Sequence, residues 1–116
     1  MKNNTAGKWA EFLARMYLRC GGWQIVGHNY ITGRGTKAGE IDIIAKRGKT
    51  LIFVEVKKRA DLETAAYAIA PTQQARIRRG AEVFLQKHPQ YRDYTIRFDA
   101  VLVQLPFFLR RLPNAF

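Results

Sequence analysis

The sequence predicts an α/β domain in which a mixed β-sheet is flanked by helices. Two observations predict this class. Apolar residues recur at helical spacing in two long segments, residues 5–20 and 71–88. Strand-like apolar runs occupy four shorter segments, residues 23–30, 40–46, 50–58 and 94–104. The resulting order of helix, three strands, helix and strand allows the helices to cover one or both faces of the sheet.

The length and composition are those of one globular domain with an unusual charge. We take all 116 residues as a single domain, with a core at about residues 7–104 and an apolar and basic tail at 105–116. The 47% hydrophobic and 25% charged fractions are ordinary for a globular protein. The 20 Lys and Arg against 9 Asp and Glu give a net charge of +11. Such a charge indicates a polyanionic partner, nucleic acid before anionic membrane, although a merely soluble basic protein is the plainer alternative.

The sequence disfavours several kinds of site and location. Cys20 is the only cysteine, so neither an intrachain disulfide nor a Cys-based zinc site can form. His28 and His88 lack zinc-ligand spacing. The N-terminus has no apolar signal-like region, and no stretch approaches the roughly 18 apolar residues of a membrane span. We therefore expect a cytoplasmic protein that does not enter a membrane.

The first elements have recognisable ends. Thr5 can cap the first helix, and Gly21-Gly22 can stop it. The strand at 23–30 contains Gly27, which favours an edge position. A glycine-rich basic loop follows at 32–39. Helical spacing predicts a buried face of the first helix made of Trp9, Phe12, Leu13, Met16, Tyr17 and Cys20.

The later elements are equally well bounded, apart from two segments. Residues 59–70 can be a short helix or a loop, and the tail has no clear periodicity. Pro71 and Thr72 open the second long helix, and Pro89 helps to end it. Its predicted inner residues are Ile77, Ala81, Phe84 and Leu85. Its predicted outer face carries Arg76, Arg78, Arg79 and Lys87.

Three of the scarce acids, Glu40, Asp42 and Glu55, lie inside the apolar strand runs of residues 39–57. A carboxylate buried in such a run costs several kcal/mol unless something compensates it. Because strand side chains alternate between faces, one face should carry the acids and the other should enter the core. The predicted core face consists of Ile41, Ile43, Ala45, Ile52, Val54 and Val56.

The turn between the two strands sets their register. A four-residue loop at 47–50 would place Lys46 opposite Leu51. Asp42 then falls opposite Glu55, and Glu40 opposite Lys57. Like charges directly opposite one another destabilise a sheet, whereas a divalent cation between them turns the repulsion into binding. Oxygen ligands without nearby His or Cys suit Mg²⁺ or Mn²⁺, so Asp42 and Glu55 are candidate metal ligands.

Lys57 extends this pattern toward phosphate chemistry. It follows Glu55 by two residues on the same face, where an ammonium can stabilise charge on a scissile phosphate. A metal, carboxylates and a lysine together are the parts needed for phosphodiester hydrolysis. Basic side chains around them are candidates for binding the nucleic acid: Arg34, Lys37, Lys58, Arg59, Arg76 and Arg79.

Plainer structural roles stay open for several of the acids. Glu40 can form a cross-strand ion pair with Lys57. Asp42 can accept backbone N–H groups of the glycine-rich loop. Glu11 can form an i,i+4 salt bridge with Arg15, and spacing alone favours this structural role. Asp99 alternates with Arg97 on one strand face and can serve only to balance it.

At these residues the chain resembles the YraN-type family. The resemblance is carried by Gly39-Glu40-Ile41-Asp42, by Phe53-Val54-Glu55-Val56-Lys57 and by Arg97-Phe98-Asp99, within about residues 7–104. Members are small bacterial proteins regarded as predicted nucleases of the PD-(D/E)xK restriction-endonuclease-like superfamily, distantly related to archaeal Holliday junction resolvases. The resemblance implies a restriction-endonuclease-like fold, a mixed sheet with helices around it.

The resemblance also implies roles for single residues. Asp42 and Glu55 would be metal ligands and Lys57 the catalytic lysine. Glu11 matches the acidic residue of the family's first helix, which assists at the metal. Glu40 belongs to the family motif and is a helper candidate. Gln73 stands near the position where the family commonly has lysine, so a helper role there would come without charge.

The function expected from the residues and the resemblance together is a Mg²⁺- or Mn²⁺-dependent endodeoxyribonuclease acting on branched or otherwise structured DNA. The main alternative is a nucleic-acid-binding module that has the nuclease fold without catalysis. A small RNA-associated or ribosome-associated protein is a third hypothesis, which gives no reason for the buried acids. A homodimer, through the tail or the first helix, is a further expectation.

Overall fold

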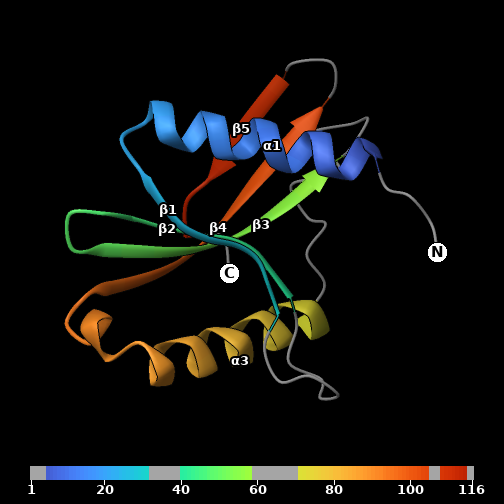
Figure 1. The fold of residues 1–116 in the computed structure, drawn as a ribbon. Helices are drawn as coiled ribbons and strands as arrows, with labels where there is room; N and C mark the ends of the chain where they lie inside the picture. Colours follow the sequence, from blue (N-terminus) through green and yellow to red (C-terminus); the bar gives the residue numbers. More distant parts are fainter. Residues whose placement is uncertain (1–4, 32–39, 59–70, 105–107, 115–116) are drawn as a thin grey trace.

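A computed structural model describes residues 5–31, 40–58, 71–104 and 108–114 (Figure 1). The elements in chain order are α1 (Thr5–Cys20), β1 (Gln24–Ile31), β2 (Glu40–Arg47), β3 (Thr50–Lys58), α3 (Pro71–Lys87), the 3₁₀ turn η1 (Pro89–Tyr91), β4 (Thr95–Gln104) and β5 (Phe108–Leu112). The predicted order of helix, three strands, helix and strand is confirmed. The segment 59–70, left as helix or loop by the sequence, and the loop at 32–39 lie outside the described residues.

The strands form one five-stranded mixed sheet in the order β1-β2-β3-β4-β5. β1, β2 and β3 pair antiparallel, β3 and β4 pair parallel, and β5 returns antiparallel to β4. α3 lies in the crossover that a parallel pair requires. β5 corrects the interpretation of the tail, because residues 108–112 belong to the sheet. Their pairing partner is the outer edge of β4, which local periodicity does not reveal.

The sheet is the middle layer of three, with α1 on one face and α3 on the other (Figure 1). The cluster under α1 contains Ala10, Ala14, Leu18, Trp23, Ile43, Ala45, Ile52, Val54, Val101 and Val103. The cluster under α3 contains Ile41, Ile44, Leu51, Phe53, Ile77, Ala81, Phe84 and Tyr91. Both sheet faces are therefore buried, which explains the near-continuous apolar run of β3.

The register predicted for the central hairpin is confirmed from Lys46–Leu51 to Ile43–Val54. The predicted pairs Asp42–Glu55 and Glu40–Lys57 are not among the pairs of this ladder, and the loop is shorter than expected. Arg47 also pairs with Thr50, so the loop has two residues rather than four. Gly48 at the first loop position has φ of 59°, as a type II′ hairpin turn requires there.

Strict alternation fails in β2 at Asp42. Ile43 packs under α1 with Ala45, Ile52 and Val54, whereas Ile41 packs with Ile44 under α3, so the predicted common face of Ile41 and Ile43 is wrong. The change falls between the pairs His28–Ile43 and Tyr30–Ile41. Asn29 lies between them on β1 with φ of 51°, a left-handed conformation that twists the hairpin locally.

The prediction of the buried face of α1 is also wrong. Ala10, Ala14 and Leu18 are buried, with Leu13 partly so, while Cys20 is exposed. The large side chains expected inside are 40–45% exposed: Trp9, Phe12, Met16 and Tyr17. Two apolar stripes lie side by side on this helix, and small alanines let the helix approach the sheet closely. Periodicity alone does not say which of two adjacent stripes faces the sheet.

The homodimer stays a prediction, and this exposed apolar side of α1 is the surface through which we expect it. Replacing Phe12 by lysine should leave the fold intact, because the ring is 41% exposed, and should lower the molar mass in light scattering from two chains to one. Lys8→Ala, at an exposed position of the same helix, is the control. A wild-type protein that is monomeric throughout the concentration range would contradict this expectation.

The predicted faces of the second long helix are confirmed. Ile77, Ala81 and Phe84 of α3 are buried, and Leu85 packs against the same cluster. The side chains at Arg76, Arg78, Arg79 and Lys87 are exposed. Within the described residues, no helix is long and apolar enough to cross a membrane.

Candidate active site

The candidate site lies where β2 and β3 separate. Their ladder ends at the pair Ile43–Val54, and Asp42, Glu55 and Lys57 lie just beyond it. There the backbone N–H of Val56 donates to Asp42 Oδ2 at 2.8 Å. The Asp42 carboxylate thus takes up a strand N–H past the last paired residues. The expected hydrogen bond to a backbone N–H exists, but its donor is on β3 rather than in the glycine-rich loop.

Glu55 is held from α3 and from its own strand. It is buried, and its Oε2 accepts a hydrogen bond of 2.6 Å from Gln73 Nε2. Lys57 Nζ lies 3.3 Å from the same oxygen and donates to Gln73 Oε1 at 3.1 Å. Gln73 lies in the first turn of α3, so the start of that helix fixes the carboxylate and the ammonium relative to each other. The alternative pairing of Lys57 with Glu40 is not what the structure shows, since its ion pair is with Glu55.

The two carboxyl groups of Asp42 and Glu55 are electrostatically strained. Burial, followed by the negative charge of Glu55, raises the pKa of Asp42 to about 8. Burial also raises the pKa of Glu55, although Lys57, a hydrogen bond from the Asp42 carboxyl and one from Gln73 act in the opposite direction. If both carboxyl groups are ionised, they repel each other. This repulsion is relieved when a cation binds between them or when one of them is protonated. The two side chains therefore interact, although beyond the end of the ladder and not as the directly opposite pair that was predicted.

Glu11 and Glu40 border this pair. Burial and then the charge of Glu40 raise the pKa of Glu11, more than Arg15 lowers it, and Glu55 adds a smaller contribution. Glu11 and Glu40 in turn raise the pKa of Asp42. Four of the nine acids in the chain thus lie close enough to interact electrostatically, and Glu11 interacts with Glu40 and Glu55 as well as with Arg15.

Asn29 joins these two outer acids and was missed by the sequence analysis. With its amide nitrogen facing them, Asn29 donates to Glu11 Oε1 at 2.9 Å and to Glu40 Oε2 at 3.1 Å. Its side chain comes from β1, at the position with left-handed backbone. An asparagine within a strand, a residue type that tolerates this conformation, was the signal that could have pointed to it.

The candidate nucleic-acid-binding residues are only partly placed. Arg76 and Arg79 are exposed on α3, whose first turn carries Gln73. Arg34, Lys37, Arg59 and the side chain of Lys58 lie outside the described residues, and their roles remain predictions.

The donor set suits a hard divalent cation. Two interacting carboxyl groups, each with a raised pKa, supply oxygen ligands, and a bound cation would stabilise their ionised forms. Within the described ranges, no three Asp, Glu, His or Cys side chains are grouped closely enough to make a preformed metal cluster. Asp42 and Glu55 therefore fit Mg²⁺ or Mn²⁺ as a carboxylate pair, of the kind that leaves ligand positions to water and phosphate.

The sequence of this same region matches a family model. The model described as "Uncharacterised protein family UPF0102" covers residues 10–103, which include Glu11, Asp42, Glu55 and Lys57. The chain belongs to the UPF0102 family. The YraN-type resemblance is thereby confirmed.

Relatives within UPF0102 are similar over most of their length. A UPF0102 protein of Paramagnetospirillum magneticum is 43% identical over 94% of this chain and 84% of its own. One from Rhodopseudomonas palustris is 46% identical over 92% of this chain and 76% of its own. One from Granulibacter bethesdensis is 39% identical over 99% of this chain and 70% of its own.

A solved structure shares the fold of this UPF0102 chain. Hjc of Archaeoglobus fulgidus, described as a Holliday junction resolvase from an archaeal hyperthermophile, superposes with a TM-score of 0.53. The match covers 89% of this chain and 72% of Hjc, at 17% sequence identity. A likeness at this identity shows the fold alone. The expected α/β nuclease-like fold, with a mixed sheet between helices, is confirmed.

Proposed function

We propose that this UPF0102 protein is a divalent-metal-dependent endonuclease that hydrolyses phosphodiester bonds in DNA, with branched DNA as the preferred substrate. One observation carries the proposal: the carboxyl groups of buried Glu55 and partly buried Asp42 interact, with the ammonium of Lys57 3.3 Å from Glu55. A fold that needed only stability would not gather like charges at the end of a central ladder. The fold of Hjc, described as a Holliday junction resolvase, supports branched DNA as the first substrate to test.

Each side chain has a distinct part in this proposal. Asp42 and Glu55 would hold Mg²⁺ or Mn²⁺, which when bound supplies Lewis-acid polarisation of the phosphate and a more acidic attacking water. Lys57 would donate to a phosphate oxygen and offset the negative charge that develops there. Gln73 positions both Glu55 and Lys57 through its two hydrogen bonds. Glu11 and Glu40 form the outer acidic rim of the site, joined by Asn29.

The charge of the whole chain supports the polyanionic substrate. A net charge of +11 attracts phosphate backbones over a distance set by the salt concentration. Exposed Arg76 and Arg79 on α3 lie on the same helix as Gln73 and can contact phosphates beside the site. Binding should therefore weaken steeply with added salt, since each neutralised phosphate releases counterions.

The experiment that tests the proposal is a cleavage panel. Labelled four-way-junction, flap, nicked, hairpin, duplex and single-stranded DNAs are incubated with Mg²⁺, with Mn²⁺ and with EDTA. We expect cleavage of the branched substrates with either metal and none with EDTA. Cleavage that continues in EDTA would contradict the metal role, and equal cleavage of every substrate would contradict the preference for branched DNA.

Gln73 offers a second test, of positioning rather than chemistry. Replacing Gln73 by alanine should lower the cleavage rate about 10–100-fold, because groups that orient metal ligands typically have effects of that size. Gln73→Lys, which supplies the residue common in the family near this position, should recover part of the rate. Gln86→Ala, an exposed glutamine of the same helix, is the control and should change nothing. A Gln73→Ala enzyme with wild-type rate would remove the positioning role.

A nucleic-acid-binding module without catalysis is the alternative from a different class. It is favoured by the engagement of Lys57, whose ammonium contacts both Glu55 and Gln73. Titration calorimetry separates the two functions. Binding of Mn²⁺ that disappears in Asp42→Asn supports the nuclease, whereas DNA binding with no such metal binding supports the module.

A further inference from the structure

A pocket of about 280 Å³ lies at the far end of α1 from the candidate active site. It is lined by Tyr17, Leu18, Cys20, Gly21, Trp23, Arg47 and Arg111. None of the acids of the candidate site is among these residues. Glu11 precedes Cys20 by nine residues on the same helix, which separates the two places by about 14 Å along the helix axis.

Three guanidinium groups gather around one buried tryptophan beside this pocket. Arg47 lies 4.4 Å from the ring centroid of Trp23, Arg97 5.7 Å and Arg111 5.8 Å. They come from the end of β2, from β4 and from β5, so three strands bring them together. The ring face attracts cations, but three like charges around one ring still repel one another.

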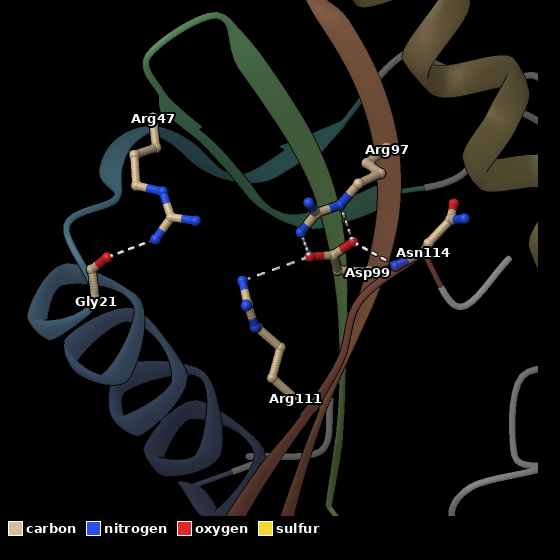
Figure 2. Close-up of polar contacts among 6 residues, drawn as sticks. All are labelled: Gly21, Arg47, Arg97, Asp99, Arg111 and Asn114. Atoms are coloured by element: carbon tan, nitrogen blue, oxygen red, sulfur yellow. Dashed lines mark hydrogen bonds and ion pairs between the residues drawn. The ribbon is translucent and has the colours of Figure 1, made fainter.

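Asp99 is the carboxylate that pairs with two of these cations, Arg97 and Arg111, and both of its oxygens already accept hydrogen bonds. Arg97 Nε donates to Asp99 Oδ1 at 3.1 Å and Arg97 Nη2 to Oδ2 at 2.8 Å, while the backbone N–H of Asn114 donates to Oδ1 at 2.8 Å (Figure 2). The pairing of Asp99 with Arg97 considered from the sequence is thus confirmed. Arg111 Nη1 is 3.9 Å from Oδ2 and, among the described residues, is a buried nitrogen without a hydrogen-bond partner.

Arg47 contacts the chain at the C-terminal end of α1. Its Nη1 donates to the carbonyl oxygen of Gly21 at 2.8 Å (Figure 2). Helix C-termini are normally unfavourable for anions, because their free carbonyls carry negative charge. Here the N–H groups of Gly21, Gly22 and Trp23 occupy the carbonyls of Leu18 and Arg19. The guanidinium of Arg47 donates to the carbonyl of Gly21, so its positive charge offsets part of the negative charge at this helix end.

We propose that this pocket binds a phosphate group between Arg47 and Arg111. With one carboxylate for three guanidiniums, the described groups leave an excess of two positive charges. A guanidinium presents paired N–H donors that match phosphate oxygens, so the two that line this pocket suit one phosphate. At about 280 Å³ the pocket has about nine times the roughly 30 Å³ that one water occupies, which leaves room for a sugar attached to the phosphate.

The proposal goes beyond the proposed nuclease activity and does not depend on it. The phosphate can belong to a nucleic-acid strand or to a phosphorylated small molecule, since both present the same oxygens. A nucleic acid held here would pass along α1 toward Glu11, about 14 Å away.

Nuclear magnetic resonance with inorganic phosphate as the probe tests the pocket. Phosphate is titrated at constant ionic strength against sodium chloride, and the two indole N–H signals are followed. We expect a saturable shift for Trp23, which lines the pocket, and none for Trp9 on the exposed side of α1. Arg47→Gln and Arg111→Gln should each weaken phosphate binding about tenfold or more, as expected for a lost charged hydrogen bond.

The controls make the result decisive. Arg92→Gln removes an exposed arginine just after η1, on the α3 side, and should bind phosphate as wild type does. Arg47 is exposed, so its variant folds even if Arg111→Gln disturbs Asp99. No saturable shift of Trp23, or unchanged binding in Arg47→Gln, would overturn the proposal, as would equal weakening in Arg92→Gln.

Two further titrations distinguish the sources of the phosphate. Adenosine 5′-monophosphate represents the small molecules, and duplex DNA with and without a 5′-phosphate represents nucleic acid. Weaker DNA binding in Arg47→Gln assigns the pocket to a nucleic-acid strand. Weaker binding of the mononucleotide, with DNA binding unchanged, assigns it to a small phosphorylated ligand. If Arg47→Gln changes neither, the phosphate pocket is wrong.

Discussion

Cleavage of branched DNA should fall about 10²–10³-fold when Lys57 is replaced by alanine, because removing one donor that stabilises transition-state charge has effects of this size. Asp42→Asn should lower it at least as far, since the variant lacks half of the carboxyl pair that would hold the metal. Single-turnover cleavage of a labelled junction, under saturating protein, measures both changes without interference from weaker binding.

Metal binding separates the roles of these two residues. Asp42→Asn should lose the calorimetric signal of Mn²⁺ binding, whereas Lys57→Ala should keep it, because the ammonium is no metal ligand. DNA affinity measured with EDTA present should stay within a few-fold of wild type for both, since neither residue belongs to the basic surface. This pattern distinguishes loss of chemistry from loss of binding.

Matched substitutions elsewhere guard against general effects of charge. Lys87→Ala removes an exposed lysine of α3, and Asp93→Asn neutralises an exposed aspartate; neither should affect cleavage. Because Lys57→Ala leaves Glu55 buried without its cation, folding is checked by circular dichroism, and Lys57→Arg serves as a charge-retaining second variant. Full cleavage by both Lys57→Ala and Asp42→Asn would exclude the proposed chemistry.

Without divalent cations, the wild-type protein should be less stable at pH 8 than near pH 5. The pKa of Asp42 rises from 3.8 to about 8 in the folded chain, so the folded state holds a proton that the unfolded state releases. This contribution to stability is complete below about pH 4 and is lost as the pH rises through about 8. Each pKa unit corresponds to about 1.4 kcal/mol, so the three pH units from 5 to 8 set an upper bound of about 4 kcal/mol. Because Asp42 is only partly buried, we expect the free energy of unfolding, measured with urea, to fall by about 2–3 kcal/mol.

Asp42→Asn should remove most of this dependence on pH. The asparagine oxygen can still accept the N–H of Val56, and the variant carries no charge to oppose Glu55. At pH 8 in EDTA we therefore expect Asp42→Asn to be more stable than wild type, and Asp93→Asn to be indistinguishable from it. Adding Mn²⁺ should raise the stability of the wild type alone, by about 2.7 kcal/mol at one hundred times the dissociation constant. An Asp42→Asn protein that is less stable than wild type at pH 8 would show that the carboxylate supports the fold instead.

The sequence by itself determined the central part of this protein. The hairpin register from Lys46–Leu51 to Ile43–Val54 follows from the short connection between two strands, and Asp42 and Glu55 are the residues that come next on each strand. The faces of α3 followed from helical periodicity, because that helix has a single apolar stripe with arginines opposite it. These features depend on residues close together in the chain, so local patterns were enough.

Only the tertiary structure decided how distant elements meet. In the folded chain the alanine stripe of α1, and not the aromatic one, packs on the sheet, and Ile41 packs under α3. β5 pairs with β4 as an additional strand. The tertiary structure also brought Asn29 and Gln73 to the acids, and Arg47, Arg97 and Arg111 to Trp23. Each of these contacts joins residues far apart in sequence, and its free energy depends on packing between whole elements that no local pattern contains.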